Sequence, residues 1–281
     1  MSESLLPGAA PPGLAKKAAT GAALLLVLLA GACAAAPLVA PYAFDAIDLE
    51  SVRQPPSLHH LMGTDDLGRD VFTRVLFGGR ISILIGVLAA SLGTLVGTSV
   101  GALAGFRGGA VDNLLMRATD VAHSLPTLPL LILLGSYSRS AAGSMVVLLG
   151  LLSWMPTARV VRAQVLSIKE RAYVEAARSL GAGDWRLVTR HVLPNALGPI
   201  LVGATLGVGN AIMIESSLSF LGLGVQPPTP TWGNMLMDSQ ATMSTKPWLT
   251  IFPGLAILLV VLAVNFLGDV LSDALDPAVG S

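Results

Sequence analysis

Residues 81–105 read ISILIGVLAASLGTLVGTSVGALAG, a run of apolar and small residues without a single charged side chain. At 1.5 Å of rise per residue, about 20 such residues cross a hydrocarbon core of about 30 Å as one helix. Glycines recur in this run at every fourth position: Gly93, Gly97, Gly101 and Gly105. Because positions four apart lie on one helical face, we expect that face to pack closely against a second helix. The alternative interpretation of the glycine face is a surface along which two helices slide during transport.

The composition of the whole chain is that of a membrane protein. Hydrophobic residues make up 53% of the 281 residues and charged residues 12%, whereas a soluble domain has about 25% charged residues. The formal net charge is zero, which argues against a nucleic-acid partner because such a partner requires a basic excess. The one cysteine, Cys33, excludes an internal disulfide and a cysteine-rich metal site.

Five other segments are similarly apolar, so the chain is predicted to be an all-α polytopic membrane protein with six transmembrane helices. The predicted spans are residues 19–40, 81–105, 111–135, 142–160, 196–223 and 248–271. Pro126 and Pro129 interrupt the third span, because proline cannot complete the helical hydrogen bonds. The predicted tails are residues 1–18 and 274–281, the predicted loops are 41–80, 161–195 and 224–247, and the core domain is 81–273.

The first apolar segment admits two other interpretations. It could be a cleaved signal peptide, with Lys16 and Lys17 as its basic region and Ala34–Ala36 as its cleavage site. The sequence LAGAC, which ends at Cys33, also partly resembles a lipoprotein signal. Both would precede a soluble protein, whereas more membrane segments follow here, so we expect a retained anchor.

Orientation follows from the positions of lysine and arginine, which favour the cytoplasmic side. With the N-terminus inside, eleven of these 17 residues fall on the inner side and six on the outer side. We therefore predict that both termini and the loop 161–195 are cytoplasmic. The outer-side arginines between Arg69 and Arg80 run against the rule.

Charged residues inside spans require a reason, because a charge in lipid is costly. Glu215 lies well inside the fifth span, and two interpretations stay open for it. It could be a buried carboxylate satisfied by neighbouring hydroxyls such as Ser216 and Ser217, or a group that lines or gates a polar path. In the third span, Arg117 and Asp120 are three residues apart and are expected to form an ion pair.

The sequence gives little support to an enzyme. None of the four lysines follows a glycine, so the chain has no P-loop for ATP. A His-Glu-x-x-His zinc motif is absent, and the adjacent His59 and His60 have no third ligand nearby in the sequence. His123 has no evident nucleophile as a partner. We expect no catalytic residue, no metal site and no cofactor bound by this chain.

The polar loop before the fifth span predicts two short helices. Residues 168–180 have helix-forming composition, the glycine-rich segment 181–183 breaks that helix, and Asp184 is expected to N-cap a second helix running through His191. The turn into the fifth span is predicted at Pro194–Asn195.

A small-residue stripe marks the first of these two helices. On or near it lie Tyr173, Ala176, Ala177 and Leu180. Such a surface suits insertion into a groove on another protein. A basic amphipathic hairpin resting on anionic lipid is equally compatible with the composition.

The same loop carries a familiar spacing of residues. Glu175-Ala176-Ala177 is followed by three residues, Gly181, nine residues and then His191-Val192-Leu193-Pro194. This resembles the EAA motif of bacterial ABC importer permeases, Glu-Ala-Ala-x3-Gly-x9-Ile-x-Leu-Pro. His191 departs from the general isoleucine, and a His-x-Leu-Pro-Asn ending is typical of the peptide and nickel branch.

Other segments extend the resemblance over roughly residues 60–277. They are GTDDLGRD at 63–70, ESSLSFLGLG at 215–224, PTWG at 230–233 and DALDP at 273–277. All resemble the C-type permease subunit of dipeptide, oligopeptide and nickel importers. The resemblance implies a MetI-like fold of six spans in the bacterial inner membrane.

The resemblance also implies partners and sites. The partners are a second permease subunit, two ABC ATPase subunits that hold ATP and Mg, an extracytoplasmic substrate-binding protein and membrane lipid. The residues expected at the ATPase are Tyr173, Glu175, Ala176, Ala177, Leu180, Gly181, Leu193 and Pro194, with Glu175 as the polar anchor. Asn210 and Glu215 are expected along the translocation path. The solute would be a peptide, a nickel chelate or glutathione, and a membrane scaffold that transports nothing is the alternative.

Overall fold

The computed structural model describes residues 12–137 and 142–275, with side chains described from residue 20 onward. Regular structure in these residues is helical, apart from one bridge between Thr64 and Asp70. The α-helices are α1 (Pro12–Ala34), α2 (Ala36–Val39), α3 (Val71–Arg107), α4 (Gly109–Ser124), α5 (Thr127–Tyr137), α6 (Ala142–Leu152), α7 (Trp154–Lys169), α8 (Ala172–Ser179), α9 (Asp184–Leu187), α10 (Leu193–Phe220), α11 (Trp232–Ser239) and α12 (Trp248–Leu275). A π-helical segment, Val188–Val192, joins α9 to α10, and a 3-10 turn, Gln240–Thr242, follows α11.

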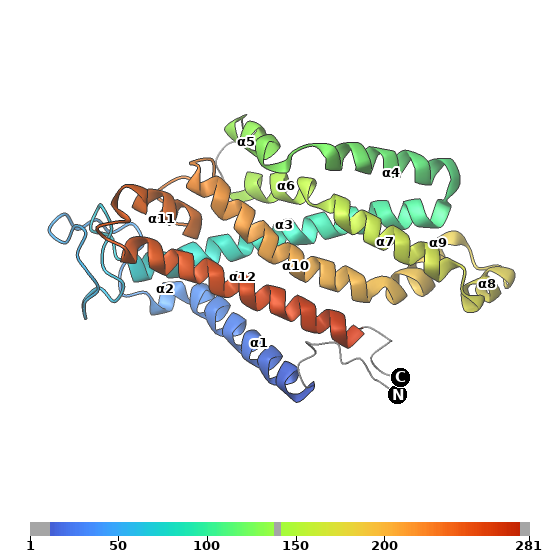
Figure 1. Ribbon diagram of the computed structural model, residues 1–281, viewed down its shortest axis with the longest axis horizontal. Helices are drawn as coiled ribbons and strands as arrows, with labels where there is room; N and C mark the ends of the chain where they lie inside the picture. The colour runs from blue at the N-terminus through green and yellow to red at the C-terminus, as the bar shows by residue number, and fades with distance from the viewer. Residues whose placement is uncertain (1–11, 138–141, 276–281) are drawn as a thin grey trace, which may run out of the picture.

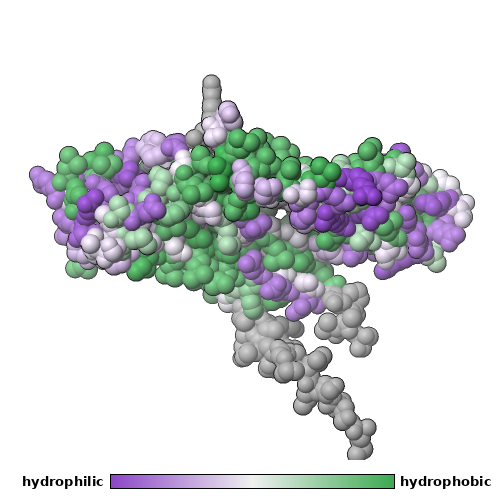
Figure 2. Space-filling model, turned by 45° about the horizontal axis from the view of Figure 1, so that its top comes forward, coloured by the Kyte–Doolittle hydropathy of each residue, from purple (hydrophilic) through white to green (hydrophobic). Residues whose placement is uncertain are grey.

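The long helices lie side by side along the longest axis of the molecule (Figure 1). Helix α10 packs against α3 and α12, helix α1 packs against α12 and α3, and helices α6 and α7 also pack against α3. One end of the bundle carries α8 and α9, and we call residues 170–192 the hairpin. The opposite end, residues 40–70 and 221–247, is called the cap. Figure 2 shows a largely hydrophobic belt across the middle of the molecule and hydrophilic surface towards both ends.

Three helices in the described residues are long and apolar enough to cross a membrane. They are Val71–Arg107, the continuous helix Asp184–Phe220, and Trp248–Leu275. Two bent pairs also qualify when each is taken as one span: α4 with α5, bent by 82°, and α6 with α7, bent by 42°. The described apolar part of α1, Thr20–Ala34, falls short of this length. The structure therefore supports three to five spans by length and composition.

The glycine face of α3 is the contact surface for α6 and α7. A Cβ on Gly97 would lie 2.6 Å from the Trp154 carbonyl oxygen, and one on Gly105 would lie 2.9 Å from the Arg162 carbonyl oxygen. Real Cβ atoms do not approach a backbone oxygen so closely. The predicted close packing of this face is therefore confirmed, with backbone against backbone.

The bent pair α4–α5 contains the predicted proline interruption. The chain leaves the helix at Leu125, whose ψ of 132° is extended, as expected for a residue before proline. Pro126 lies in the break, and Pro129 is accommodated in the first turn of α5.

Two helix boundaries around the hairpin differ from the prediction. The helix expected over residues 168–180 is split, because Arg171 is extended (φ −74°, ψ 142°) between α7 and α8. The N-cap of α9 is Gly183, and Asp184 is the first helical residue, so the predicted Asp184 cap is wrong. Neither Glu170 nor Arg171 breaks helices by composition, which is why the split is invisible in the sequence.

The turn predicted at Pro194–Asn195 is also wrong. Pro194 lies inside one helix that runs from Asp184 to Phe220, and an irregular turn directly before it accommodates the missing N–H. The π-helical segment Val188–Val192 precedes it, and the Asn195 amide donates to the His191 carbonyl (2.6 Å). The second hairpin helix is therefore the start of the fifth apolar helix.

Helix α1 is packed into the bundle. Cys33 is 4% exposed and belongs to one hydrophobic core with Val75 and Trp232. A Cβ on Gly79 of α3 would overlap the Cys33 sulfur. This packing favours the retained anchor over a lipid-modified cysteine, whose sulfur must be accessible.

Two ion pairs join α4 to α7. Arg162 binds Asp112 through two bonds, Nε to Oδ1 at 2.5 Å and Nη2 to Oδ2 at 2.6 Å. Arg159 donates to Asp120 at 2.9 Å. The predicted pairing of Asp120 with Arg117 is therefore wrong, since the tertiary partner is the better placed of the two.

Candidate functional site

The tip of the hairpin is a well-defined helix end. The Gly181 N–H donates to the Arg178 carbonyl (2.9 Å), and the Ala182 N–H donates to the Ala177 carbonyl (3.1 Å), the two bonds of a Schellman motif. Gly181 has a φ of +85°, a region that glycine enters without steric cost. The break predicted at Gly181 is confirmed, and its geometry is set by the backbone.

A small hydrophobic core fixes the hairpin to the bundle. Val174, Leu187 and Val192 are fully buried in it. Ala177 and Leu193, two residues expected at the ATPase, pack against the same core and are partly buried. These two residues therefore support the hairpin from inside.

The remaining residues expected at the ATPase are exposed in this chain. They are Tyr173, Glu175, Ala176, Leu180, Gly181 and Pro194. Leu180 is 89% exposed, and Trp185, which lies outside the EAA motif, is 80% exposed. The sequence signal for Trp185 is an aromatic residue in an otherwise polar segment, and the EAA motif does not include this position.

The hairpin projects past the ends of the neighbouring helices (Figure 1). The Lys169 ammonium donates to the Gly105 carbonyl (2.9 Å), and the Arg178 guanidinium lies over the Phe106 ring, 5.9 Å from its centre. These two contacts tie the end of α7, directly before the hairpin, and the middle of the hairpin to the last turn of α3.

A cavity of about 1040 Å³ opens between α3, α4, α5, α6, α7, α10 and α12. Asn210, one of the two residues expected along the path, lines it. Its polar lining comes from Thr94, His123, Thr127, Ser153, Thr157, Gln164, Arg171, Asn195, Asn210 and Ser272. Arg171 is the charged group of this lining and no acidic residue is part of it, counting only residues that the structure describes.

Glu215 is fully buried and does not line this cavity. Ser219 donates to one carboxylate oxygen (2.7 Å), and Ser82 of α3 donates to the other (3.0 Å). Ser216 is 3.5 Å away, whereas Ser217 donates to the Met213 carbonyl. The contacts favour the buried, hydroxyl-satisfied carboxylate, with Ser82 and Ser219 as the main donors.

The same network reaches the cap through Ser82. The Trp232 backbone N–H donates to the Ser82 hydroxyl (3.3 Å), and the Trp232 indole donates to the Val75 carbonyl (2.9 Å). Thr231 and Asn234 form a reciprocal capping box that starts α11. The ESSLSFLGLG and PTWG segments therefore meet α3 in one buried polar cluster.

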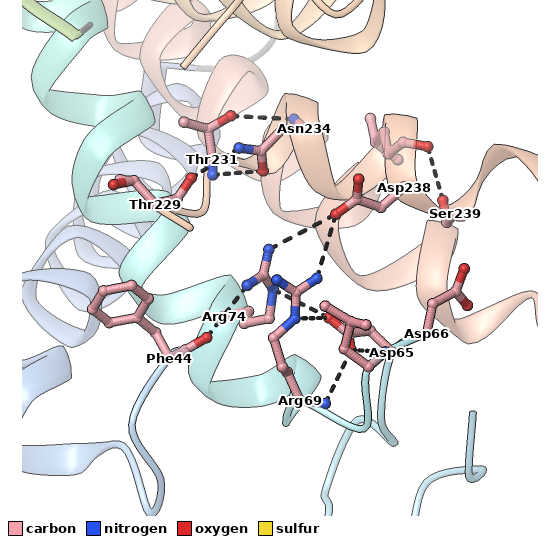
Figure 3. Close-up of polar contacts among 12 residues, drawn as sticks. Phe44, Asp65, Asp66, Arg69, Arg74, Thr229, Thr231, Asn234, Asp238 and Ser239 are labelled. Carbon is pink, nitrogen blue, oxygen red and sulfur yellow. Dashed lines mark hydrogen bonds and ion pairs between the residues drawn. The ribbon is translucent and has the colours of Figure 1, made fainter. Parts of the chain in front are cut away.

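A second polar cluster in the cap accounts for the outer arginines (Figure 3). Arg69 binds Asp65 (2.7 Å), and Arg74, which is 1% exposed, lies 3.5 Å from the same carboxylate. Both guanidinium groups also approach Asp238 of α11, at 3.7 and 3.9 Å. Two of the arginines that oppose the orientation rule are therefore neutralised within the protein. Burial raises the pKa of Asp238, while Arg74 and Arg69 oppose that shift.

One short sequence has the form of a serine-hydrolase motif. Residues 97–101 read GTSVG, a Gly-x-Ser-x-Gly pattern. Ser99 lies in the middle of α3 and its hydroxyl donates to the Leu95 carbonyl (2.8 Å). A nucleophile elbow requires a sharp strand-to-helix turn, whereas Ser99 is an exposed residue of a continuous helix, so the pattern is no hydrolase site here.

Spanning helices around a cavity, with an ordered hairpin at one end, define a helical permease. The family described as the binding-protein-dependent transport system inner membrane component matches residues 97–281. The chain belongs to this family and is a permease subunit of an ABC importer, a multi-pass protein of the bacterial inner membrane.

Named relatives match nearly the whole chain. A Brucella suis protein described as a peptide permease is 45% identical, over 94% of this chain and 88% of that protein. The oligopeptide transport system permease protein OppC of Bacillus subtilis is 41% identical, over 90% and 83%. The glutathione transport system permease protein GsiD of Escherichia coli is 43% identical, over 92% and 86%.

Two solved structures share the fold. One is the MetNI methionine ABC transporter, with a TM-score of 0.56 and 20% identity, covering 73% of this chain and 97% of that chain. The other is an amino acid ABC transporter, with a TM-score of 0.53 and 17% identity, covering 72% and 94%. The predicted MetI-like fold is confirmed at the level of architecture.

Proposed function

We propose that this chain is one of two related permease subunits in an importer for peptides or a related small solute, such as glutathione or a nickel chelate. The support is the named function of its relatives at 41 to 45% identity. A second permease, two ATPase subunits and an extracytoplasmic binding protein complete the complex. ATP and Mg are held by the ATPase subunits and not by this chain.

The proposed topology has six spans: α1, α3, α4–α5, α6–α7, α9–α10 and α12. Both termini and the hairpin are cytoplasmic, and the cap is extracytoplasmic. Two observations support this arrangement. The first residues of α1 and the last of α12 lie towards the hairpin end (Figure 1). The excess of lysine and arginine is on that side, and Arg69 and Arg74 are paired in the cap.

The proposed half-path is the cavity, which the second permease closes on its open side. Asn210 faces the passing solute, and Glu215 stiffens the wall behind it by joining α10 to α3. A polar lining whose one charged group is Arg171, counting the described residues, suits passage in an apolar wall, because most of it offers hydrogen bonds without holding a charge tightly.

The observation that carries the coupling proposal is the attachment of the hairpin. Its core residues Val174 and Leu187 are fully buried, while Glu175 between them is exposed. The hairpin is continuous with α10, which lines the cavity. Movement of an ATPase bound to the hairpin is therefore conveyed to the path. Glu175 is the polar anchor, and Ala176 permits close approach.

The test uses the complete importer reconstituted in vesicles. Glu175→Lys is expected to lower solute-stimulated ATP hydrolysis and uptake together, while the protein still inserts. Glu170→Lys reverses the charge of a second exposed carboxylate near the start of the hairpin and is the matched control. Unchanged coupling in Glu175→Lys would contradict the assignment. A scaffold without transport would instead purify without a second permease or a P-loop ATPase.

A further inference from the structure

Arg171 carries the one charge in the lining of the cavity, counting the residues that the structure describes. We infer that its guanidinium binds a carboxylate of the passing solute and selects solutes that carry one, such as peptides and glutathione, over chelates of net positive charge. This inference rests on the proposed function and narrows its solute class. It concerns the end of the cavity at which the hairpin begins.

Arg171 is the last member of a row of cavity-lining side chains on and after α7. The row is Thr157, Val161, Gln164, Ile168 and Arg171, and its spacing of three and four residues is that of one helical face. Helix α7 ends at Lys169, and Arg171 is the N-cap of α8. A solute that moves along this row towards the hairpin therefore meets uncharged side chains first and the guanidinium last.

The side chain of Arg171 has no partner within the described part of the chain. Arg159 and Arg162 of α7 are each paired with an aspartate of α4. No described carboxylate lies within ion-pair distance of Arg171, and its guanidinium donates no hydrogen bond to the described residues. Glu170 and Glu175 are close in sequence, but both are exposed and neither lines the cavity. The donors of Arg171 are therefore available to an anion that arrives from outside the chain.

The chemistry of this end of the cavity suits a carboxylate. A guanidinium presents a planar fork of N–H donors that matches the two oxygens of a carboxylate. Asn195 near the start of α10 and Ser272 near the end of α12 line the same cavity and add an amide and a hydroxyl. Low-dielectric walls also focus the field of a charge that faces a cleft. Since the described lining contains no acidic residue, this field attracts anionic groups and repels cations.

The backbone of Arg171 belongs to the hairpin. Its carbonyl accepts hydrogen bonds from the Val174 N–H (2.9 Å) and the Glu175 N–H (3.2 Å), and Val174 is fully buried in the core that the hairpin shares with the bundle. A movement of the hairpin therefore carries the guanidinium with it. The contact with the solute carboxylate is made and broken as the ATPase moves the hairpin.

The first experiment reads Arg171 directly. The purified permease pair in phosphatidylcholine nanodiscs is treated with phenylglyoxal, which modifies arginine, and the modification of each arginine is measured by mass spectrometry. The probes are trialanine and its C-terminal amide, which differ in the carboxylate alone. Trialanine is expected to protect Arg171, and the amide is expected to leave it reactive. Arg107, which is exposed at the end of α3 and outside the cavity lining, is the internal control that neither probe protects.

The second experiment measures the affinity of both probes by equilibrium dialysis. The wild-type pair is expected to bind trialanine about 10-fold more tightly than the amide, the effect of one charge-assisted hydrogen-bonded pair. Arg171→Gln should abolish this difference, and Arg171→Lys, which keeps the charge without the fork, should retain part of it. Arg107→Gln removes the same charge outside the cavity and should bind both probes as the wild type does.

The outcomes separate this inference from the proposed function, which uptake by the complete importer tests. If the wild-type importer takes up a peptide or glutathione, while trialanine neither protects Arg171 nor binds more tightly than its amide, the inference is wrong and the proposed function stands. If the importer takes up neither solute, both fall. Two further arms add ATPase subunits or phosphatidylglycerol to the nanodiscs. Protection of Arg171 by either one, without any effect of trialanine, would identify another occupant and overturn the inference.

Discussion

The cap and the hairpin place the same residue types in opposite surroundings. In the cap Trp232 is 1% exposed and its indole is hydrogen bonded, whereas Trp185 of the hairpin is 80% exposed. Beside the cap Glu215 is buried among hydroxyls, whereas Glu175 of the hairpin lies in solvent. The polar and aromatic side chains of the cap make internal contacts, whereas those of the hairpin are exposed and available to a partner. Substitutions in the two regions should therefore separate stability from coupling.

The tryptophans should show the largest contrast. Trp232→Ala removes a fully buried ring and is expected to cost about 4 kcal/mol of unfolding free energy. Trp185→Ala is expected to leave stability within about 0.5 kcal/mol. The measurement is thermal unfolding, followed by reaction of a fluorogenic thiol reagent with Cys33, the one cysteine of the chain. Equal losses in the two variants would break the comparison.

The carboxylates come next. Glu215→Ala leaves the Ser82 and Ser219 hydroxyls without their acceptor and opens a gap, at an expected cost of about 3 kcal/mol. Glu175→Ala should leave the unfolding midpoint unchanged and lower solute-stimulated ATP hydrolysis. Glu215→Gln keeps an acceptor oxygen and is expected to fall between wild type and Glu215→Ala. A normal midpoint for Glu215→Ala would show that the network contributes nothing to stability.

The glycines give a smaller contrast of the same sign. A Cβ on Gly233 of α11 would lie 2.7 Å from the Ser216 carbonyl oxygen, whereas one on Gly183 of the hairpin meets nothing within 4 Å. Gly233→Ala is expected to cost about 2 kcal/mol through overpacking. Gly183→Ala replaces a helix N-cap and should cost no more than about 0.5 kcal/mol. The same thiol assay measures both, and a larger loss for Gly183→Ala would reverse the comparison.

Asp238 should give the smallest effect, and one that depends on pH. Because burial raises its pKa, keeping Asp238 ionised in the folded cap carries a cost above that pKa. Asp238→Asn removes this cost, so at neutral pH it should raise the unfolding midpoint slightly. As the pH falls through the folded pKa, wild-type Asp238 takes up a proton and the difference should vanish. Unfolding midpoints of the two proteins across that range test the sign, and a variant less stable at neutral pH would contradict it.

The sequence predicts the elements of this fold better than their junctions. The apolar runs predict the long helices, the four-residue glycine spacing predicts the packing face of α3, and the glycine-rich segment 181–183 predicts the turn at Gly181. Neither the split at Arg171 nor the continuous helix through Pro194 has a local signal in the sequence.

The candidate site was predicted to a similar extent. The motif indicates the hairpin, but it does not distinguish Ala176, which is exposed, from Ala177, which packs inward. Glu215 and Arg74 each have one partner from a distant segment, Ser82 and Asp238, beside partners nearby in the chain. The Ser82 donor lies 133 residues from Glu215, a distance that spacing arguments do not reach.

The unbroken helix from Asp184 to Phe220 has a mechanical consequence. From the π-helical segment to Phe220 it is about 40 Å long at 1.5 Å per residue, and its near end is part of the hairpin. Tilting such a rod by about 10° around that segment displaces its far end by about 7 Å, comparable to the width of a small peptide chain. A small rotation at the hairpin therefore produces, at the far end of the helix, a displacement comparable to the size of the transported solute.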